Sequence, residues 1–293
     1  MSPALTGLLL QMAALLLFVG LDSITKAMTA HFPVPQLVFT RFLFHTLAVA
    51  LVLGLTMGRL PWRSRAPVMQ TVRSLTLVVA NILFTIALSR IPLADAAAVS
   101  FAGPVLTVAL AAWWLKEVVS LRRWIGVVVG FAGVLVALRP PFLTGEEAPD
   151  WAIILPLGTA AVFAVYQILT RRLAGVDDPR TTILHTGLAA CLVTSLAQPF
   201  VWVPPSGEQW VMLALAGLFG ASGHFLLIQA YSRAPASLLA PTSYTQLVWA
   251  TLSSWLFFAD DPDGWTLLGA GIIAVGGVIV AWPSRAAGVA QGR

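Results

Sequence analysis

The chain has 293 residues, of which 58% are hydrophobic and only 10% are charged. Soluble domains carry about 25% charged residues, so this composition excludes an ordinary soluble enzyme or binding module. The net charge of +5 does not indicate a nucleic-acid partner, because the basic residues concentrate in short breaks between long apolar segments. That distribution is typical of a polytopic membrane protein whose partner along its length is membrane lipid.

Ten stretches contain no Asp, Glu, Lys or Arg: residues 5–21, 42–58, 74–89, 96–115, 124–138, 151–170, 181–207, 209–232, 234–259 and 264–284. Most of them approach the ~20 residues that an α-helix needs to cross ~30 Å of hydrocarbon. A soluble helical bundle would need polar faces on these helices, which the segments lack. The sequence therefore predicts an all-α membrane protein with ten transmembrane helices.

The predicted helices of the first half run, in chain order, over about residues 5–26, 37–57, 69–90, 94–116 and 124–138. Those of the second half run over about residues 151–172, 181–203, 209–232, 236–259 and 265–282. The longest polar break, P-P-F-L-T-G-E-E-A-P-D at 140–150, joins the two halves. The predicted organisation is a first repeat at 1–140, a linker at 141–150, a second repeat at 151–283 and a tail at 284–293.

The two halves share a pattern at a spacing of 143 residues. Four residues of the first half, Ala87, Ser89, Arg90 and Pro92, recur as Ala230, Ser232, Arg233 and Pro235. Two glycines, Gly126 and Gly133, recur as Gly269 and Gly276. This indicates a duplicated unit, as is common in transporters. An odd number of helices in each half makes the second half enter from the opposite side, so the repeats should be inverted, related by an axis in the membrane plane.

The charge distribution predicts the orientation. With the N-terminus inside, thirteen Lys and Arg residues fall on the inner side and four (Lys26, Arg41, Arg90 and Arg139) on the outer side. The positive-inside rule therefore predicts that both termini are cytoplasmic. Residues 1–4 lack a basic region, so no cleaved signal peptide is expected and the first helix is retained.

Polar side chains within apolar helices are costly and tend to face the bundle interior or a water-filled cavity. The candidate substrate-binding residues come from five predicted helices: Asn81, Thr85, Ser100, Phe101, Pro104, Tyr166, Gln167, His224, Gln229, Tyr244, Gln246 and Trp249. Asn81 and Thr85 share a helix face because they are four residues apart. For any single residue the alternative is a helix–helix hydrogen bond, but the cluster as a whole favours a central cavity.

Two prolines, Pro104 and Pro241, fall within predicted helices. Inside a helix, Pro104 would free the carbonyl of Ser100, which could then accept a hydrogen bond from a substrate ammonium group. A packing kink is the alternative for Pro104, and it is the favoured interpretation for Pro241, which lies close to its helix start. The glycines at 126, 130, 133, 269, 271, 276 and 277 are expected to serve close helix packing rather than a dimer face.

Four charged residues, Asp22, Lys26, Arg41 and Asp95, lie near the outer ends of predicted helices, where snorkelling or capping accounts for them. Asp22 aligns with Gln167 and could therefore border the cavity. No carboxylate is predicted deep in a helix, so the usual carboxylate proton relay is missing. The remaining titratable candidates inside helices are three histidines: His45, His185 and His224. Proton coupling and facilitated transport both stay open.

The run A-L-S-R-I-P-L-A-D-A-A-A at 87–98 and the run L-K-E-V-V-S-L-R-R-W-I-G-V-V-V-G-F-A-G-V-L at 115–135 resemble the EamA module, which defines the ten-helix drug/metabolite transporter superfamily. T-R-F at 40–42 and A-P-T-S-Y-T-Q-L-V-W-A at 240–250 are similar to it too. The chain departs from the module at Asp260, where glutamate is usual. The resemblance implies export of small metabolites, amino acids among them, across a bacterial inner membrane. It also implies a central cavity lined by helices 1, 3, 4, 6, 8 and 9.

The expected function is a monomeric exporter of neutral or aromatic amino acids that works by alternating access. The aromatic candidates offer apolar area and no fixed countercharge. The alternatives are an importer, an exporter of cationic drugs, which should need a buried carboxylate, and an intramembrane lipid-modifying enzyme, which should need a catalytic pair. We find no phosphate loop, paired carboxylates, metal-ligand cluster or nucleophile arrangement, so no cofactor, metal or enzymatic activity is expected. The single Cys191 excludes an intrachain disulfide.

Overall fold

The computed structural model describes residues 2–88, 90, 99–140, 151–249, 252 and 264–281. The predicted linker, the predicted tail, Asp95 and Asp260 lie outside these residues. The elements of the first half are α1 (Pro3–Met28), α2 (Val34–Met57), α3 (Pro67–Leu88), α5 (Gly103–Trp114) and α6 (Leu121–Leu138). Those of the second half are η1 (Trp151–Ile153), α8 (Ile154–Leu173), α9 (Pro179–Ser195), α10 (Gln198–Val201), α11 (Gly207–Arg233), α12 (Ala236–Leu239), η2 (Ala240–Tyr244) and α14 (Gly264–Ala281).

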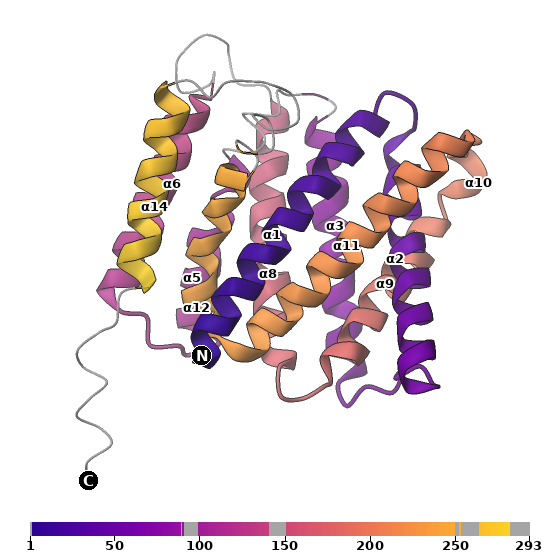
Figure 1. The fold of residues 1–293 in the computed structure, drawn as a ribbon, viewed down its shortest axis with the longest axis horizontal. Helices are drawn as coiled ribbons and strands as arrows, with labels where there is room; N and C mark the ends of the chain where they lie inside the picture. The colour runs from indigo at the N-terminus through magenta and orange to yellow at the C-terminus, as the bar shows by residue number, and fades with distance from the viewer. Residues whose placement is uncertain are drawn as a thin grey trace.

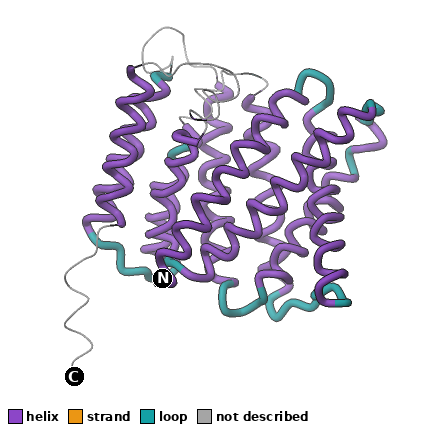
Figure 2. Tube along the Cα trace, in the orientation of Figure 1, coloured by secondary structure: helices purple, strands orange, loops and turns teal. Residues whose placement is uncertain are grey.

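Every element in the described part of the chain is helical, and the helices lie side by side in one bundle (Figure 2). Six of them, α1, α2, α3, α6, α8 and α11, are long and apolar enough to cross a membrane, and α5 and α14 are shorter apolar helices. Large apolar side chains such as Leu51, Leu55 and Leu192 are exposed on the outside of the bundle. In a membrane protein such a surface contacts lipid tails, so the prediction of an all-α membrane protein is confirmed.

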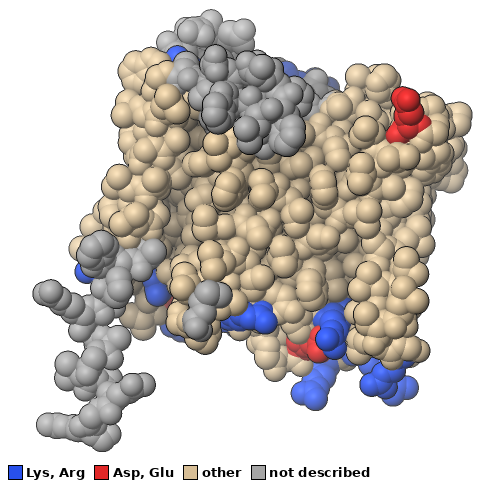
Figure 3. Space-filling view, in the orientation of Figure 1, with Lys and Arg blue, Asp and Glu red and all other residues tan. Residues whose placement is uncertain are grey.

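The bundle is built from a small set of helix pairs. α1 packs along α11, α3 along α8, and α2 against both α9 and α11. In Figure 1, α1 and α11 cross the front of the bundle together, and α6 and α14 form a separate pair at its left edge. Basic side chains gather at one end of the molecule, along the lower rim of Figure 3, which we call the basic end.

α6 and α14 meet through glycines. A Cβ added to Gly126 would lie 2.9 Å from the carbonyl oxygen of Gly276, and one added to Gly276 would lie 2.9 Å from that of Gly126. The same reciprocal contact joins Gly133 and Gly269, at 2.9 Å and 2.6 Å. Rising residue numbers on one helix meet falling numbers on the other, so the pair is antiparallel. These glycines let the two backbones touch, which is the packing role predicted for them.

Both prolines lie at helix breaks and not inside helices. α5 begins at Gly103 with Pro104 in its first turn, after helical residues 99–100 and a turn at 101–102. The prediction of a mid-helix proline at 104 is therefore wrong, because the first turn of a helix has no use for the N–H that proline lacks. The predicted helix at 236–259 is likewise broken. α12 leads into the 3₁₀ turn η2, which carries Pro241 in its own first turn, and helical residues 245–249 follow.

A buried arginine joins three helices. Arg73 on α3 is fully buried and donates from Nε to Thr170 at 2.7 Å, from Nη1 to Thr186 at 2.7 Å and from Nη2 to Tyr166 at 3.0 Å. The acceptors come from α8 and α9, and the guanidinium also lies over the Tyr166 ring, 4.6 Å from its centre. The sequence assigned Arg73 to the charges of the inner surface, and that assignment is wrong. The three hydroxyl groups provide inside the bundle the hydrogen bonds that water would otherwise supply.

A carboxylate at the basic end joins two loops. Asp177, in the turn between α8 and α9, accepts hydrogen bonds from the Ser64 hydroxyl, from the Arg65 backbone N–H at 2.8 Å and from Gln70 Nε2 at 2.8 Å. Burial alone would raise the pKa of Asp177, but these hydrogen bonds outweigh burial and hold the pKa below its usual value. The α2–α3 loop is thereby held against the second half.

We expect Gly269→Ala to destabilise the protein by about 1–3 kcal/mol, because the added methyl group would lie within 2.7 Å of backbone atoms of α6. Gly271→Ala is the matched control, since a Cβ there meets no atom within 4 Å. Thermal unfolding in detergent, followed by size-exclusion chromatography, measures both variants. Equal midpoints for the two variants would contradict the glycine contact.

We expect Arg73→Ala to lower stability by about 2–4 kcal/mol, because it leaves a cavity and removes the donor from three buried hydroxyl groups. Arg59→Ala is the control, since Arg59 is exposed just after α2, and a surface change of this kind costs less than about 0.5 kcal/mol. The same unfolding measurement applies. An Arg73→Ala midpoint equal to that of Arg59→Ala would show that the buried arginine does not hold the helices together.

Candidate functional site

An acidic side chain inside the bundle marks the candidate site. Asp22 lies six residues before the end of α1, within the apolar span Pro3–Thr25, yet its side chain is exposed. Its Oδ2 accepts a hydrogen bond from Gln246 Nε2 at 3.3 Å. A carboxylate at this depth avoids lipid and faces either a partner or water. Its bond to Gln246 therefore indicates a water-accessible surface between α1 and the helical segment 245–249.

A basic side chain faces the same surface from α2. Arg41 donates from Nη1 to Asn81 Oδ1 on α3 at 2.9 Å, and its charge interacts with that of Asp22. The prediction that snorkelling or capping explains Arg41 is wrong, because α2 begins at Val34 and Arg41 lies two turns inside it. Asn81 Nδ2 donates in turn to the Leu77 carbonyl at 2.8 Å, which fixes the direction of its amide.

The polar surface continues along α1 towards the basic end. Gln11 lies eleven residues before Asp22, which is three turns along the same helix face. Its Nε2 donates to Ser243 Oγ at 3.4 Å, and its Oε1 is buried without a hydrogen-bond partner in the described part of the chain. Segment 243–249 thus meets α1 through two polar contacts, Gln11 with Ser243 and Asp22 with Gln246. Of the two residues on this segment, only Gln246 was a predicted site residue.

Two aromatic side chains pack together, Phe101 in the turn before α5 and Tyr244 in η2. The Phe101 and Tyr244 ring centres are 6.0 Å apart, and Gly130 of α6 makes room for the Tyr244 ring. Ser100 Oγ, Tyr244 Oη and Trp249 Nε1 are buried and find no hydrogen-bond partner among the described residues. Buried polar groups normally have partners, so three unpartnered groups on neighbouring elements are the expected property of a site that a ligand or water completes.

Three of the predicted cavity residues make buried hydrogen bonds inside the bundle instead. Tyr166 Oη accepts from Arg73 Nη2 and also forms a hydrogen bond with His224 Nδ1 at 3.1 Å. Gln167 Oε1 accepts from Thr107 of α5 at 3.2 Å and from the Tyr231 hydroxyl of α11. All three predicted residues are buried, so they lie below the accessible surface and not on it.

The other predicted residues have separate places. Thr85 donates back to the Asn81 carbonyl at 2.7 Å and so shares the helix face predicted for the two. Gln229 accepts from Arg233 in the last turn of α11, at the basic end and away from Asp22. Pro104 begins α5 next to Phe101. The structure thus brings Asn81 to Arg41 and Gln246 to Asp22. Phe101 lies against Tyr244, and Gln229 lies elsewhere.

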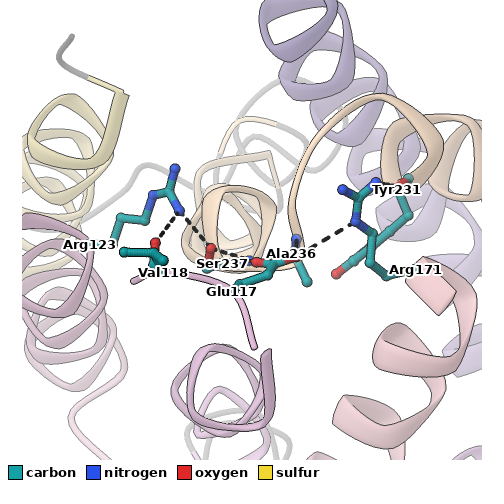
Figure 4. A network of polar contacts seen from close by, with 7 residues as sticks. All are labelled: Glu117, Val118, Arg123, Arg171, Tyr231, Ala236 and Ser237. Carbon is teal, nitrogen blue, oxygen red and sulfur yellow. Dashed lines mark hydrogen bonds and ion pairs between the residues drawn. The ribbon is translucent and has the colours of Figure 1, made fainter. Parts of the chain in front are cut away.

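At the basic end of the bundle, one carboxylate links neighbouring segments (Figure 4). Glu117, just after α5, accepts hydrogen bonds from the backbone N–H groups of Ala236 and Ser237, each at 3.1 Å, and from the Ser237 hydroxyl at 2.7 Å. It also pairs with Arg171 Nε of α8 at 3.6 Å, while Arg123 donates to Ser237 Oγ at 2.8 Å. The carboxylate therefore caps the start of α12 from another helix.

This arrangement can bind a small polar molecule but has no reacting centre. Among the described residues no group of three His, Cys, Asp or Glu side chains lies close enough to hold a metal ion. The exposed or part-exposed groups are the Asp22 carboxylate, the Arg41 guanidinium and the amides of Asn81 and Gln246, which recognise charged and hydrogen-bonding groups. Sequence reasoning missed Gln11 and the inward-facing Arg41. For Arg41 the sequence held a signal of an inward-facing side chain, because Arg41 and His45 are four residues apart and so share a helix face.

The chain was compared with known proteins. The EamA-like transporter family matches it twice, over residues 5–139 and 150–282. An S-adenosylmethionine uptake transporter of Rickettsia felis is 29% identical over 239 residues, covering 81% of this chain and 79% of the relative. A riboflavin transporter of Rhizobium johnstonii is 28% identical over 280 residues, covering 93% and 89%.

A pseudopaline exporter of Pseudomonas aeruginosa is 26% identical over 277 residues, covering 92% of this chain and 94% of the relative. A solved crystal structure superposes with a TM-score of 0.81 at 22% identity, covering 94% of this chain and 96% of that one, which establishes the shared fold. The named relatives are transporters and not enzymes, and they include both uptake and export proteins. The two family matches together span most of the sequence, and the chain is therefore a membrane transporter of the EamA-like family, within the drug/metabolite transporter superfamily.

Proposed function

We propose that the protein carries neutral and aromatic amino acids across the bacterial inner membrane by alternating access. The observation that carries this proposal is an exposed carboxylate, Asp22, within the apolar span of α1, in a bundle whose segments Glu117 links at the basic end. A carrier needs a binding site that reaches one side of the membrane while the other side is sealed.

Alternating access in this proposal rests on two inverted five-helix repeats at 1–140 and 151–283, ten helices in all. The reciprocal glycine contacts support it, because Gly126 meets Gly276 and Gly133 meets Gly269. Under the spacing of 143 residues these are one contact and its symmetric copy. The helix pairs agree, since α1 on α11 becomes α8 on α3 when the halves are exchanged. The α6–α14 and α2–α9 pairs map onto themselves.

The proposed orientation has both termini in the cytoplasm and the linker at 141–150 in the periplasm. The loops at 58–66 and 115–120 at the basic end carry four of the basic residues counted as inner: Arg59, Arg63, Arg65 and Lys116. The positive-inside rule places such loops in the cytoplasm. The Asp22 surface then opens towards the outside in this state. The working unit is proposed to be a monomer, since both halves of the site come from one chain.

The proposed substrate follows from the accessible groups. A carboxylate, a guanidinium and the amides of Asn81 and Gln246 suit the polar end of an amino acid, and Phe101, Tyr244 and Trp249 supply apolar area for its side chain. Transport runs outward when the cytoplasmic concentration is the higher one. The sequence disfavoured cationic drugs because no carboxylate was expected in the cavity. Asp22 removes that reason. Arg41 now disfavours a purely cationic substrate.

We expect proteoliposomes holding the protein to exchange labelled phenylalanine, tryptophan and leucine in counterflow, with little exchange of lysine or glutamate. Trp249→Ala should slow exchange of the two aromatic substrates several-fold more than that of leucine, because it removes aromatic contact area. Trp113→Ala, which changes an exposed tryptophan on the outside of α5, is the control. No flux for any neutral or aromatic amino acid would reject the proposed substrate.

We expect Glu117→Ala to open the basic end, because the change removes three hydrogen bonds to the start of α12 and one ion pair to α8. The reporter is a cysteine at the buried position Thr107, introduced as Thr107→Cys with Cys191→Ser. A membrane-impermeant maleimide added to inside-out vesicles should label it several-fold faster in Glu117→Ala. Glu208→Ala, an exposed carboxylate at the opposite end of α11, is the control. Equal labelling rates would contradict closure by Glu117.

A further inference from the structure

We propose that Asp22 and Arg41 select substrates carrying both an ammonium and a carboxylate group, with Asp22 binding the ammonium and Arg41 the carboxylate. This inference rests on the proposed function and adds to it the two residues that determine specificity.

Asp22 keeps capacity for a substrate ammonium. Its described hydrogen bond comes from Gln246 to Oδ2 and is long, at 3.3 Å, whereas an ionised carboxylate offers about four acceptor positions. The side chain is exposed although it lies within the apolar span of α1. Charge-assisted hydrogen bonds from an ammonium are shorter and stronger than a bond from a neutral amide, so a substrate amine would compete well for this carboxylate.

Arg41 keeps capacity for a substrate carboxylate. Its described hydrogen bond uses Nη1, and a guanidinium has five N–H donors in a planar fork that matches a carboxylate in a bidentate manner. Asn81 holds that fork in place, because its own amide is fixed by the Leu77 carbonyl at 2.8 Å. Arg41 is partly exposed, unlike Arg73, whose three described bonds are satisfied by hydroxyl groups in the closed interior.

Asp22 binds Gln246 from α1 and Arg41 binds Asn81 from α2, so the two opposite charges come from two helices. A substrate with only an amine would meet Asp22 but would also face the positive charge of Arg41. A substrate with only a carboxylate would bind Arg41 but would be repelled by the negative charge of Asp22. A zwitterion satisfies both groups, so the surface discriminates by a favourable contact and by repulsion together.

The test compares three molecules that share one ring and one chain length: L-phenylalanine, 3-phenylpropionate and phenethylamine. Thermal shift of the purified full-length protein measures the concentration at which each ligand stabilises it. We expect phenylalanine to act at a concentration at least about tenfold lower than either singly charged analogue, since one charge-assisted hydrogen bond contributes about that factor.

Two variants assign the charges. Asp22→Asn should remove the preference for phenylalanine over 3-phenylpropionate, and Arg41→Gln should remove the preference over phenethylamine. Arg41→Lys should keep part of that preference, because it keeps the charge without the fork, and it replaces Arg41→Gln if that variant does not fold. Glu208→Gln and Arg59→Gln change exposed charges away from the site and should keep wild-type preferences.

The outcomes separate this inference from the proposed function. Wild-type protein that exchanges phenylalanine while Asp22→Asn and Arg41→Lys both retain full charge preference overturns the inference and leaves the function standing. Wild-type protein that prefers the zwitterion in thermal shift but gives no flux rejects the function and leaves the binding roles standing. A wild type that all three molecules stabilise equally, or that phenylalanine does not stabilise, also overturns the inference.

Discussion

A charged side chain within a bilayer must be hydrogen-bonded by the protein or reached by water, and this requirement organises the bundle. Arg73 meets it by burial among the hydroxyls of Thr170, Thr186 and Tyr166, which join α3, α8 and α9. Asp22 and Arg41 meet it differently, because each has a described amide partner and remains accessible. The same physical cost therefore gives a structural contact in one place and a binding surface in the other.

The contacts at the two ends of the site differ in kind, which suits a molecule that must change shape. α6 and α14 touch backbone to backbone over two reciprocal glycine pairs, and such packing changes little without large loss of contact. The closure by Glu117 uses a part-exposed ion pair and three hydrogen bonds at a helix start. Part-exposed ion pairs contribute about 0–1 kcal/mol, so this contact can break and re-form at low cost.

Hydrophobicity alone was enough to predict the membrane class and most helices, because length and composition decide whether a segment can cross a bilayer. The breaks at Pro104 and Pro241 were harder, since a proline is equally compatible with a kink and with a new first turn, and only the preceding backbone distinguishes them. Arg41 was assigned to a helix end because sequence spacing gives the face of a residue and not its depth, whereas the alignment of Asp22 with Gln167 indicated the border of the predicted cavity. Arg73 was missed for the same reason, as its partners are 93 to 113 residues away along the chain.

A carrier also needs its inward-open and outward-open states to have similar free energies. A closure that held one state by more than about 5 kcal/mol would leave the other state below about one part in a thousand, and substrate binding would then have to supply the difference. The contacts that would have to break at the basic end are the Glu117–Arg171 ion pair and three hydrogen bonds to Glu117. The buried contacts of Arg73 lie between α3, α8 and α9 and need not open at all. These residues thus favour a static framework of α3, α8 and α9, with the movement at the start of α12.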